Sequence, residues 1–299
     1  MRKLSVVWVA LACIPWGAFG AHAGELDWQL WRGQSDVLFG GSVDEMHAVA
    51  IIPGGEATDR RIIFGDRQGQ VHAVRYRGGS FREEWVGRPL RSAIAEVYAD
   101  DIDADGAIEI VAYTEFGDIA FYEAADYRLS WQTTDDMFAT ISAMVLCNAD
   151  EDPQLELVFC AEQKPEVAAY RPRGPASQEE VERQRELEVS RLCIFDCKNL
   201  FLEWNSEPGL SARSILVGDL DDDGSLEIVL NTGFVVDGNY RKVEWQYPDG
   251  FGQKIGYADI DGDGVPELIG EYQSATRPRR FLRFFDVDHQ TEHFLGTGR

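Results

Sequence analysis

The sequence predicts an all-β protein, a β-propeller of five four-stranded blades, and three observations lead to this fold class. An acidic loop motif occurs four times along the 299-residue chain. A tryptophan recurs in step with that motif, and short runs of apolar or β-branched residues accompany both. Short strands repeated with a period of about 40 to 50 residues are typical of propeller blades.

The acidic loops have side-chain oxygens at positions 1, 3, 5 and 9, and a glycine at position 6 allows a sharp turn. Three copies are intact, while the second copy along the chain is worn, with Asn148 at position 1 and Pro153 at position 6. The candidate metal ligands are Asp101, Asp103, Asp105 and Glu109; Asn148, Asp150, Asp152 and Glu156; Asp219, Asp221, Asp223 and Glu227; and Asp259, Asp261, Asp263 and Glu267. Such oxygens are the ligands that a hard cation prefers. The loops therefore predict calcium as the cofactor, at three sites with a degenerate fourth.

Position 12 separates two kinds of calcium loop. An EF-hand requires a bidentate glutamate there, whereas the intact loops have Ala112, Leu230 and Gly270 at this position. Apolar runs flank each loop instead, for example residues 215–217 before and 228–230 after the loop that begins at Asp219. Such runs are typical of buried strands. Each loop is therefore expected to close a β-hairpin tied by calcium.

The spacing of these hairpins predicts complete blades. The first positions of the loops lie 47, 71 and 40 residues apart, and a tryptophan in a strand-like segment precedes each loop by 14 to 17 residues. These tryptophans are Trp85, Trp131, Trp204 and Trp245. One further strand, such as residues 119–122, separates each hairpin from the next tryptophan, which makes four strands per unit.

The expected blades cover residues 46–90, 91–138, 139–208, 209–249 and 250–299. In the first blade, the runs 48–52 and 61–64 form the hairpin, but its loop has decayed, so no calcium site is expected there. The last blade lacks a clear tryptophan strand, whereas residues 25–30 around Trp28 have that character. We expect this N-terminal segment to complete the last blade and close the ring, which would remove two exposed sheet edges.

These loops and their period resemble the FG-GAP/VCBS repeat family, the β-propellers that form the head of integrin α subunits. The resemblance covers most of the chain after residue 23. It implies that each intact loop joins the first two strands of a blade and holds calcium, and that the protein has an adhesion or recognition role. The chain differs from the family in having glutamate at position 9 and no FG-GAP string beyond fragments such as Phe64-Gly65.

The long spacing in the third blade reveals an insertion of about 26 residues, placed at about 162–190. It is rich in proline, arginine and glutamate, and Ser177 with Glu180 forms a capping-box pattern that predicts a short charged helix. The insertion is either a solvated decoration or a partner-binding arm.

The first 23 residues have the pattern of a secretory signal peptide, with a basic start, an apolar run and the small-residue cleavage site Ala21-His-Ala23. The mature chain, 24–299, is then a single exported propeller domain, periplasmic or extracellular. Acylation at Cys13, as in a lipoprotein, is the alternative. No later stretch is long and apolar enough to span a membrane.

Four cysteines remain after the predicted cleavage: Cys147, Cys160, Cys193 and Cys197. An even number in an exported chain favours disulfides. Three pairings are possible, and the preferred bridge joins Cys160 and Cys193 at the base of the insertion. Metal ligation by Cys193 and Cys197 is the alternative, although no partners stand nearby at zinc-like spacing.

Charge and motifs limit the function. With 52 acidic and 28 basic residues the formal net charge is −24, which argues against nucleic-acid binding. No GxSxG, HExxH or P-loop motif is present. The favoured function is a non-catalytic, calcium-stabilised module that binds a protein or glycan outside the cytoplasm. The alternative is a carbohydrate-active enzyme, similar to polysaccharide lyases, with convergent basic groups and tyrosine at the channel.

Overall fold

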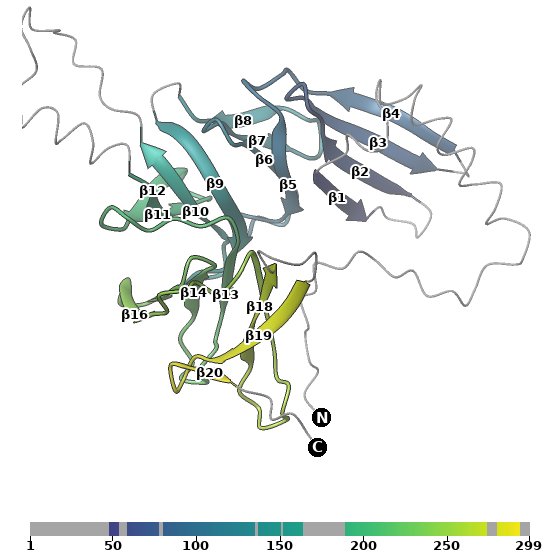
Figure 1. Cartoon of the computed structure of the whole chain (residues 1–299). Helices are drawn as coiled ribbons and strands as arrows, with labels where there is room; N and C mark the ends of the chain where they lie inside the picture. The colour runs from purple at the N-terminus through teal and green to yellow at the C-terminus, as the bar shows by residue number, and fades with distance from the viewer. Residues whose placement is uncertain are drawn as a thin grey trace, which may run out of the picture. The chain divides into compact units, whose positions relative to one another are not determined.

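The computed structural model describes residues 48–53, 59–77, 80–134, 137–150, 152–163, 189–273 and 280–293. These residues form five four-stranded antiparallel sheets, which follow one another along the chain (Figure 1). The strands of the first three sheets are β1 (Ala48–Pro53), β2 (Arg60–Gly65), β3 (Val71–Arg77) and β4 (Ser80–Val86); β5 (Ile94–Asp100), β6 (Glu109–Thr114), β7 (Ile119–Glu123) and β8 (Leu129–Gln132); and β9 (Phe138–Cys147), β10 (Glu156–Gln163), β11 (Arg191–Asp196) and β12 (Phe201–Asn205). The last two sheets contain β13 (Ile215–Gly218), β14 (Glu227–Leu230), β15 (Phe234–Asp237) and β16 (Lys242–Gln246); and β17 (Lys254–Ala258), β18 (Glu267–Gln273), β19 (Arg280–Asp286) and β20 (Thr291–His293).

Within every sheet the strands lie side by side in chain order. The five predicted units of four strands are therefore confirmed, including the first, where β1 and β2 pair as a hairpin without an intact acidic loop. The expected signal peptide, the segment around Trp28 and most of the 162–190 insertion lie outside the described residues.

The last sheet differs from the expectation. Residues 291–293 form β20, which pairs with β19, so this sheet has a fourth strand of its own. The premise that the last unit needs an N-terminal strand to reach four strands was wrong. The sequence does not predict β20 because this strand is short and contains no tryptophan.

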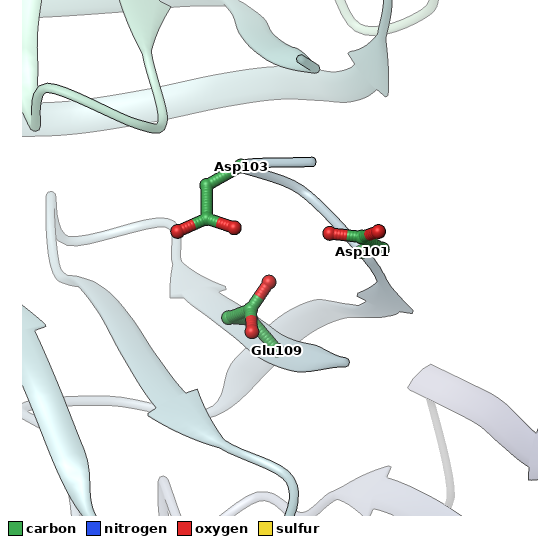
Figure 2. A group of neighbouring side chains, drawn as sticks. All are labelled: Asp101, Asp103 and Glu109. Atoms are coloured by element: carbon green, nitrogen blue, oxygen red, sulfur yellow. The ribbon is translucent and has the colours of Figure 1, made fainter. Parts of the chain in front are cut away.

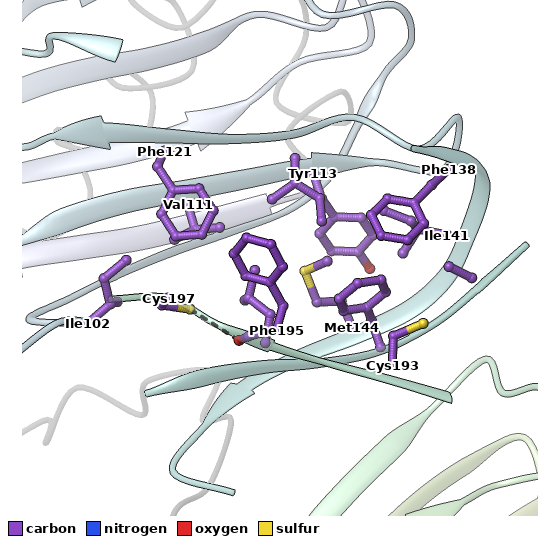
Figure 3. Close-up of a cluster of buried hydrophobic side chains, with 14 residues drawn as sticks. Ile102, Val111, Tyr113, Phe121, Phe138, Ile141, Met144, Cys193, Phe195 and Cys197 are labelled. Atoms are coloured by element: carbon purple, nitrogen blue, oxygen red, sulfur yellow. Dashed lines mark hydrogen bonds between the residues drawn. The ribbon is translucent and has the colours of Figure 1, made fainter. Parts of the chain in front are cut away.

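Each core cluster lies between two consecutive sheets. The cluster between the second and third sheets contains Val111 and Phe121 from one side and Phe159 and Phe195 from the other (Figure 3). Three similar clusters join the first and second, third and fourth, and fourth and fifth sheets. Inner strands such as β6 are therefore buried on both faces, which explains their continuous apolar runs.

Each of the four recurring tryptophans directly follows a β-bulge. In each of the first four sheets the register between the third and fourth strands shifts by one residue directly before the tryptophan. The extra residues are Glu84, Ser130, Glu203 and Glu244. Bulges re-aim side chains and interrupt the pairing edge of a strand. Here they accompany the inward-facing tryptophan on the edge strand of each sheet.

Three of these bulges also contact the next sheet. The hydroxyl of Tyr127 donates to Glu84 Oε2 at 3.0 Å, Arg241 donates to Glu203 at 3.4 Å, and the amide of Gln290 donates to the Glu244 carbonyl at 3.4 Å. All three donors occupy the left-handed φ position of the turn between the third and fourth strands. A repeated polar tie therefore joins neighbouring sheets.

The four cysteines of the third sheet are free thiols. Phe159 pairs with Cys193 while Cys160 pairs with Leu192. Because neighbouring residues of a strand point to opposite faces, the two thiols enter different core clusters. The preferred Cys160–Cys193 bridge was therefore wrong.

We expect these thiols to resist modification in the folded protein. Burial raises the pKa of all four, that of Cys147 and Cys193 to about 12, and the thiolate is the reactive form. Iodoacetamide at pH 8 should label none of them within an hour, and all four after unfolding in guanidinium without reductant. Mass spectrometry counts the adducts, and labelling that requires reductant would show a disulfide.

Among the described residues, the structure contains no helix of the length and apolarity that a bilayer span requires.

Candidate metal centres

The four acidic loops occupy equivalent places, since each joins the first two strands of its sheet. In the first of them, the carboxylates of Asp101, Asp103 and Glu109 point toward one another (Figure 2). One oxygen from each lies within 4.8 Å of the others. The other loops gather Asp150, Asp152 and Glu156; Asp219, Asp221 and Glu227; and Asp259, Asp261 and Asp263 in the same way.

Four candidate ligands lie outside these groups: Asn148, Asp105, Asp223 and Glu267. The Nδ2 of Asn148 donates to the Asp152 carbonyl, and this contact does not use the side-chain oxygen of Asn148. Asp105 and Asp223 accept the backbone N–H two residues further on, from Ala107 and Ser225, at 2.7 Å. These contacts stabilise the turn, and Asp152 and Asp263, which belong to the gathered groups, accept the same contact at 3.0 Å and 2.9 Å. The gathered oxygens thus come from positions 1, 3 and 9 in two loops, 3, 5 and 9 in the worn loop, and 1, 3 and 5 in the last.

The position-9 glutamate makes the same backbone contact in every loop. It begins the second strand, is buried, and accepts a hydrogen bond from the backbone N–H of position 2. The donor–acceptor distances are 3.1 Å for Ile102–Glu109, 2.7 Å for Ala149–Glu156, 2.6 Å for Leu220–Glu227 and 2.8 Å for Ile260–Glu267. One carboxylate oxygen thus fixes the loop, and Glu109, Glu156 and Glu227 also lie among the gathered carboxylates, whereas Glu267 does not. The sequence pattern gave no sign of this backbone contact.

Backbone conformation explains the glycines of the motif. Position 6 has φ values of +90°, +89° and +102° at Gly106, Gly224 and Gly264, a region that residues with a Cβ rarely adopt. Proline cannot adopt it either, because its ring holds φ near −65°. Pro153 therefore explains the different turn of the worn loop, although its carboxylates still gather.

The electrostatics of the loops fit a cation. Burial, with nearby aspartates as a further cause, raises the pKa of Glu109 and Glu156 to about 7 and that of Glu227 to about 8. In the same loop Asp219 Oδ1 is buried without a hydrogen-bond partner. An acceptor of this kind is costly to bury unless something binds it. The all-oxygen donor set matches calcium rather than a softer metal.

The first sheet replaces the acidic ligand with arginine. Ile63, Ala73 and Trp85 pair across its strands as Val111, Phe121 and Trp131 do in the second sheet. Arg61 is therefore the equivalent of Glu109. Its guanidinium donates to the Ala124 carbonyl and lies over the Tyr127 ring, 6.0 Å from the centroid. This hairpin therefore carries a guanidinium at the position where the acidic loops carry a carboxylate.

No protein-family model and no curated protein matches the chain. Among solved structures, it is similar to Saccharomyces cerevisiae Sqt1, with a TM-score of 0.54 and 13% identity over 82% of this chain and 60% of that one. It is also similar to the rhamnogalacturonan lyase PL11 of Bacillus licheniformis, with a TM-score of 0.55 and 12% identity over 83% of this chain and 50% of that one.

The fold is a β-propeller with five blades. The matched region covers only 60% of the length of the Sqt1 chain and 50% of the length of the lyase chain. At such low identities the similarity shows the fold alone.

The enzyme alternative expects basic groups that converge with tyrosine, and the last blade contains an arginine–tyrosine cluster of this composition. Arg283 donates to Glu292 through both Nε and Nη2, and its guanidinium lies 4.8 Å and 5.5 Å from the ring centroids of Tyr272 and Tyr247. Tyr247 also donates to Glu292 at 3.1 Å. The guanidinium is thus bonded to Glu292 and Tyr247, and the Arg283 side chain is 23% exposed, as expected of a structural tie between the last two blades.

The raised pKa values of the glutamates predict how the stability of the calcium-free propeller depends on pH. The folded state retains protons on Glu109, Glu156 and Glu227 that the unfolded state releases above its ordinary pKa of 4.5. The free energy of unfolding should therefore fall as the pH rises from about 5 to about 8. Calcium competes with these protons, so its stabilising effect should be larger at pH 8.

Calorimetry at pH 5, 6.5 and 8, with chelator and with calcium, measures both trends. The variant Glu227→Gln keeps an acceptor for the Leu220 N–H but has no proton to release, so its calcium-free stability should decrease less over this range. A calcium-free propeller that gains stability between pH 5 and 8 would contradict the prediction.

Proposed function

We propose that this protein is an exported calcium-binding β-propeller of the FG-GAP/VCBS type that recognises a protein or glycan without catalysing a reaction. The observation that supports it best is the repeated loop geometry. In each loop a buried glutamate fixes the backbone while carboxylates gather at the loop. Four independent stretches of sequence each gather three carboxylates, which repel one another unless a cation neutralises them.

Calcium would have a structural role in this proposal. It would neutralise carboxylates that otherwise repel one another and would tie the first hairpin of each blade that has an intact acidic loop. Weak sites of this kind are occupied at the high calcium concentrations outside cells, which agrees with the predicted export. Recognition would then use the surface of a rigid scaffold.

Isothermal titration calorimetry of the chelator-treated protein tests the metal part of the proposal. We expect three calcium ions to bind per chain, at the loops beginning at Asp101, Asp219 and Asp259. Magnesium should give a smaller heat of binding, because it tolerates only a tighter octahedral geometry. A fourth ion would assign a site to the worn loop as well. The absence of any calcium binding at millimolar concentration would overturn the proposal.

Export is tested separately by expressing the whole chain in a bacterial host and sequencing the N-terminus of the product. A chain that begins at Gly24 in the periplasmic fraction supports the proposed cleavage. Lipid labelling at Cys13 would assign the lipoprotein alternative, and an uncleaved cytoplasmic chain would refute export.

A further inference from the structure

The first two blades carry an arginine patch at the end opposite their acidic loops. Each blade has a loop end, where its first two strands join, and a link end, where the second and third strands join and where the chain passes to the next blade. At the link end, three exposed arginines and one exposed phenylalanine lie on neighbouring turns: Arg67, Arg88, Arg91 and Phe116. From this patch, we infer a docking surface for a protein partner that presents a carboxylate-rich segment.

Hydrogen bonds join the three turns that bear the patch. The N–H of Leu90 donates to the Gly69 carbonyl at 2.8 Å, and the amide of Gln70 donates to the Gly87 carbonyl at 3.1 Å. These contacts fix the turn of Arg67 against the link of Arg88. Backbone approach is so close that a Cβ at Gly69 would lie 2.5 Å from the Ser92 carbonyl oxygen. The patch is therefore held on rigid turns.

Arg91 is held in place by buried groups of the second blade. Its Nε donates to Asp118 Oδ1 at 2.7 Å, its backbone N–H donates to Asp118 Oδ2 at 3.1 Å, and its Nη2 donates to the Phe116 carbonyl at 3.0 Å. The Asp118 side chain is 3% exposed, whereas that of Arg91 is 35% exposed. The guanidinium and the Phe116 backbone are thus locked together, and the Phe116 residue remains 62% exposed.

The charge of the patch contrasts with the rest of the chain. The formal net charge is −24, and the acidic loops concentrate negative charge at the loop end. The described turns of the patch, residues 66–70, 87–93 and 115–118, contain one exposed acidic residue, Glu115; Asp66 is half-buried, and Asp118 is buried and paired with Arg91. An acidic partner would be repelled by most of this protein and accepted here, which favours one docking orientation.

The composition of the patch indicates what kind of partner it fits. All three cations of the patch are arginines, and residues 46–138, which cover the first two blades, contain nine arginines and no lysine. Arginine and aromatic residues are enriched at protein interfaces, whereas lysine is depleted. Guanidinium groups bind carboxylates with two parallel hydrogen bonds, and Phe116 supplies an apolar anchor beside them. This inference deepens the proposed recognition function, because it names the surface and the chemistry of the partner.

Fluorescence anisotropy with the purified protein tests the inference. The probe is a labelled 15-residue peptide of glutamate with leucine at every fourth position, measured at about 50 mM salt because surface charge interactions are screened at higher salt. Its matched control has glutamine in place of glutamate. We expect the glutamate peptide to bind at least tenfold more tightly than the glutamine peptide.

Variants locate the binding. The double substitution Arg67→Glu with Arg88→Glu should weaken binding of the glutamate peptide at least tenfold. The substitution Phe116→Ser should weaken it about threefold. A matched control, Arg82→Glu with Lys254→Glu, changes the net charge equally at exposed positions elsewhere and should weaken binding less than twofold. Thermal melting confirms that each variant folds.

Three results would overturn the inference: no binding of the glutamate peptide, equal losses in both double variants, or polygalacturonate or duplex DNA binding more tightly than the peptide at the same residues. Calcium titration reports on the opposite end of the blades. A protein that binds calcium but not the peptide would therefore refute this surface alone, and the reverse result would refute the calcium sites alone.

Discussion

Calcium should raise the melting temperature of this propeller by roughly 15 °C relative to the chelated protein. Each ion that binds only the folded state at a hundred times its dissociation constant adds about 2.7 kcal/mol, so three sites add about 8 kcal/mol. For a chain of this size, 1 kcal/mol corresponds to roughly 2 °C. Differential scanning calorimetry with millimolar calcium and with chelator measures the shift.

The loop that begins at Asp219 offers a matched pair of variants. Asp219 contributes a buried, unpaired oxygen to the gathered carboxylates, whereas Asp222, at position 4, is exposed and has a left-handed φ of +59°. Asparagine tolerates that conformation, so Asp219→Asn and Asp222→Asn remove the same charge from the same loop. The first should reduce the calcium shift by about a third, and the second should leave it nearly unchanged. Equal effects would mean that charge alone, and not a site, produces the shift.

Replacing Phe195 by alanine should destabilise the propeller by about 3 to 5 kcal/mol, as is usual for a phenylalanine deleted from a core. Phe195 is fully buried between the second and third blades, with ring centroids 5.0 Å from Trp131 and 6.1 Å from Phe121 (Figure 3). The surrounding strands are buried on both faces, so they cannot collapse into the cavity. Thermal unfolding in calcium should show a melting temperature lower by roughly 6 to 10 °C.

Phe201 provides the control for this cavity. It lies on the edge strand β12 of the same blade and is 48% exposed. Phe201→Ala removes the same atoms but opens no internal cavity. It should therefore lower the free energy of unfolding by less than about 1 kcal/mol. Similar losses for both variants would contradict the stacking of the second and third blades through Phe195.

The sequence predicted strands well where a local pattern reports on them. The acidic motif marks the first hairpin of four blades, and in its three intact copies glycine at position 6 allows the left-handed turn. Trp131 marks the fourth strand because the ring packs into the core. β20 has neither marker, so its existence depends on pairing with β19. Local sequence contains little information about such a strand.

The candidate metal ligands were predicted as sets, but their individual roles were not. The gathered carboxylates come from positions 1, 3 and 9 in two loops, from positions 3, 5 and 9 in the worn loop, and from positions 1, 3 and 5 in the last loop. This division depends on backbone direction within the turn. Likewise, the pairing of Cys160 with Cys193 was plausible from chain distance and failed on strand register, since the register of β10 and β11 places the two thiols on opposite faces.

The sequence by itself determined the number of blades, the places of the acidic loops and the all-oxygen chemistry of the candidate sites, because each depends on contacts within about ten residues. Only the tertiary structure decided which blade surfaces meet, how Glu84, Glu203 and Glu244 tie to the next blade, and where three arginine-bearing turns converge. Those contacts join residues about 20 to 46 positions apart. Their geometry comes from register, bulges and packing, which no single stretch of sequence contains.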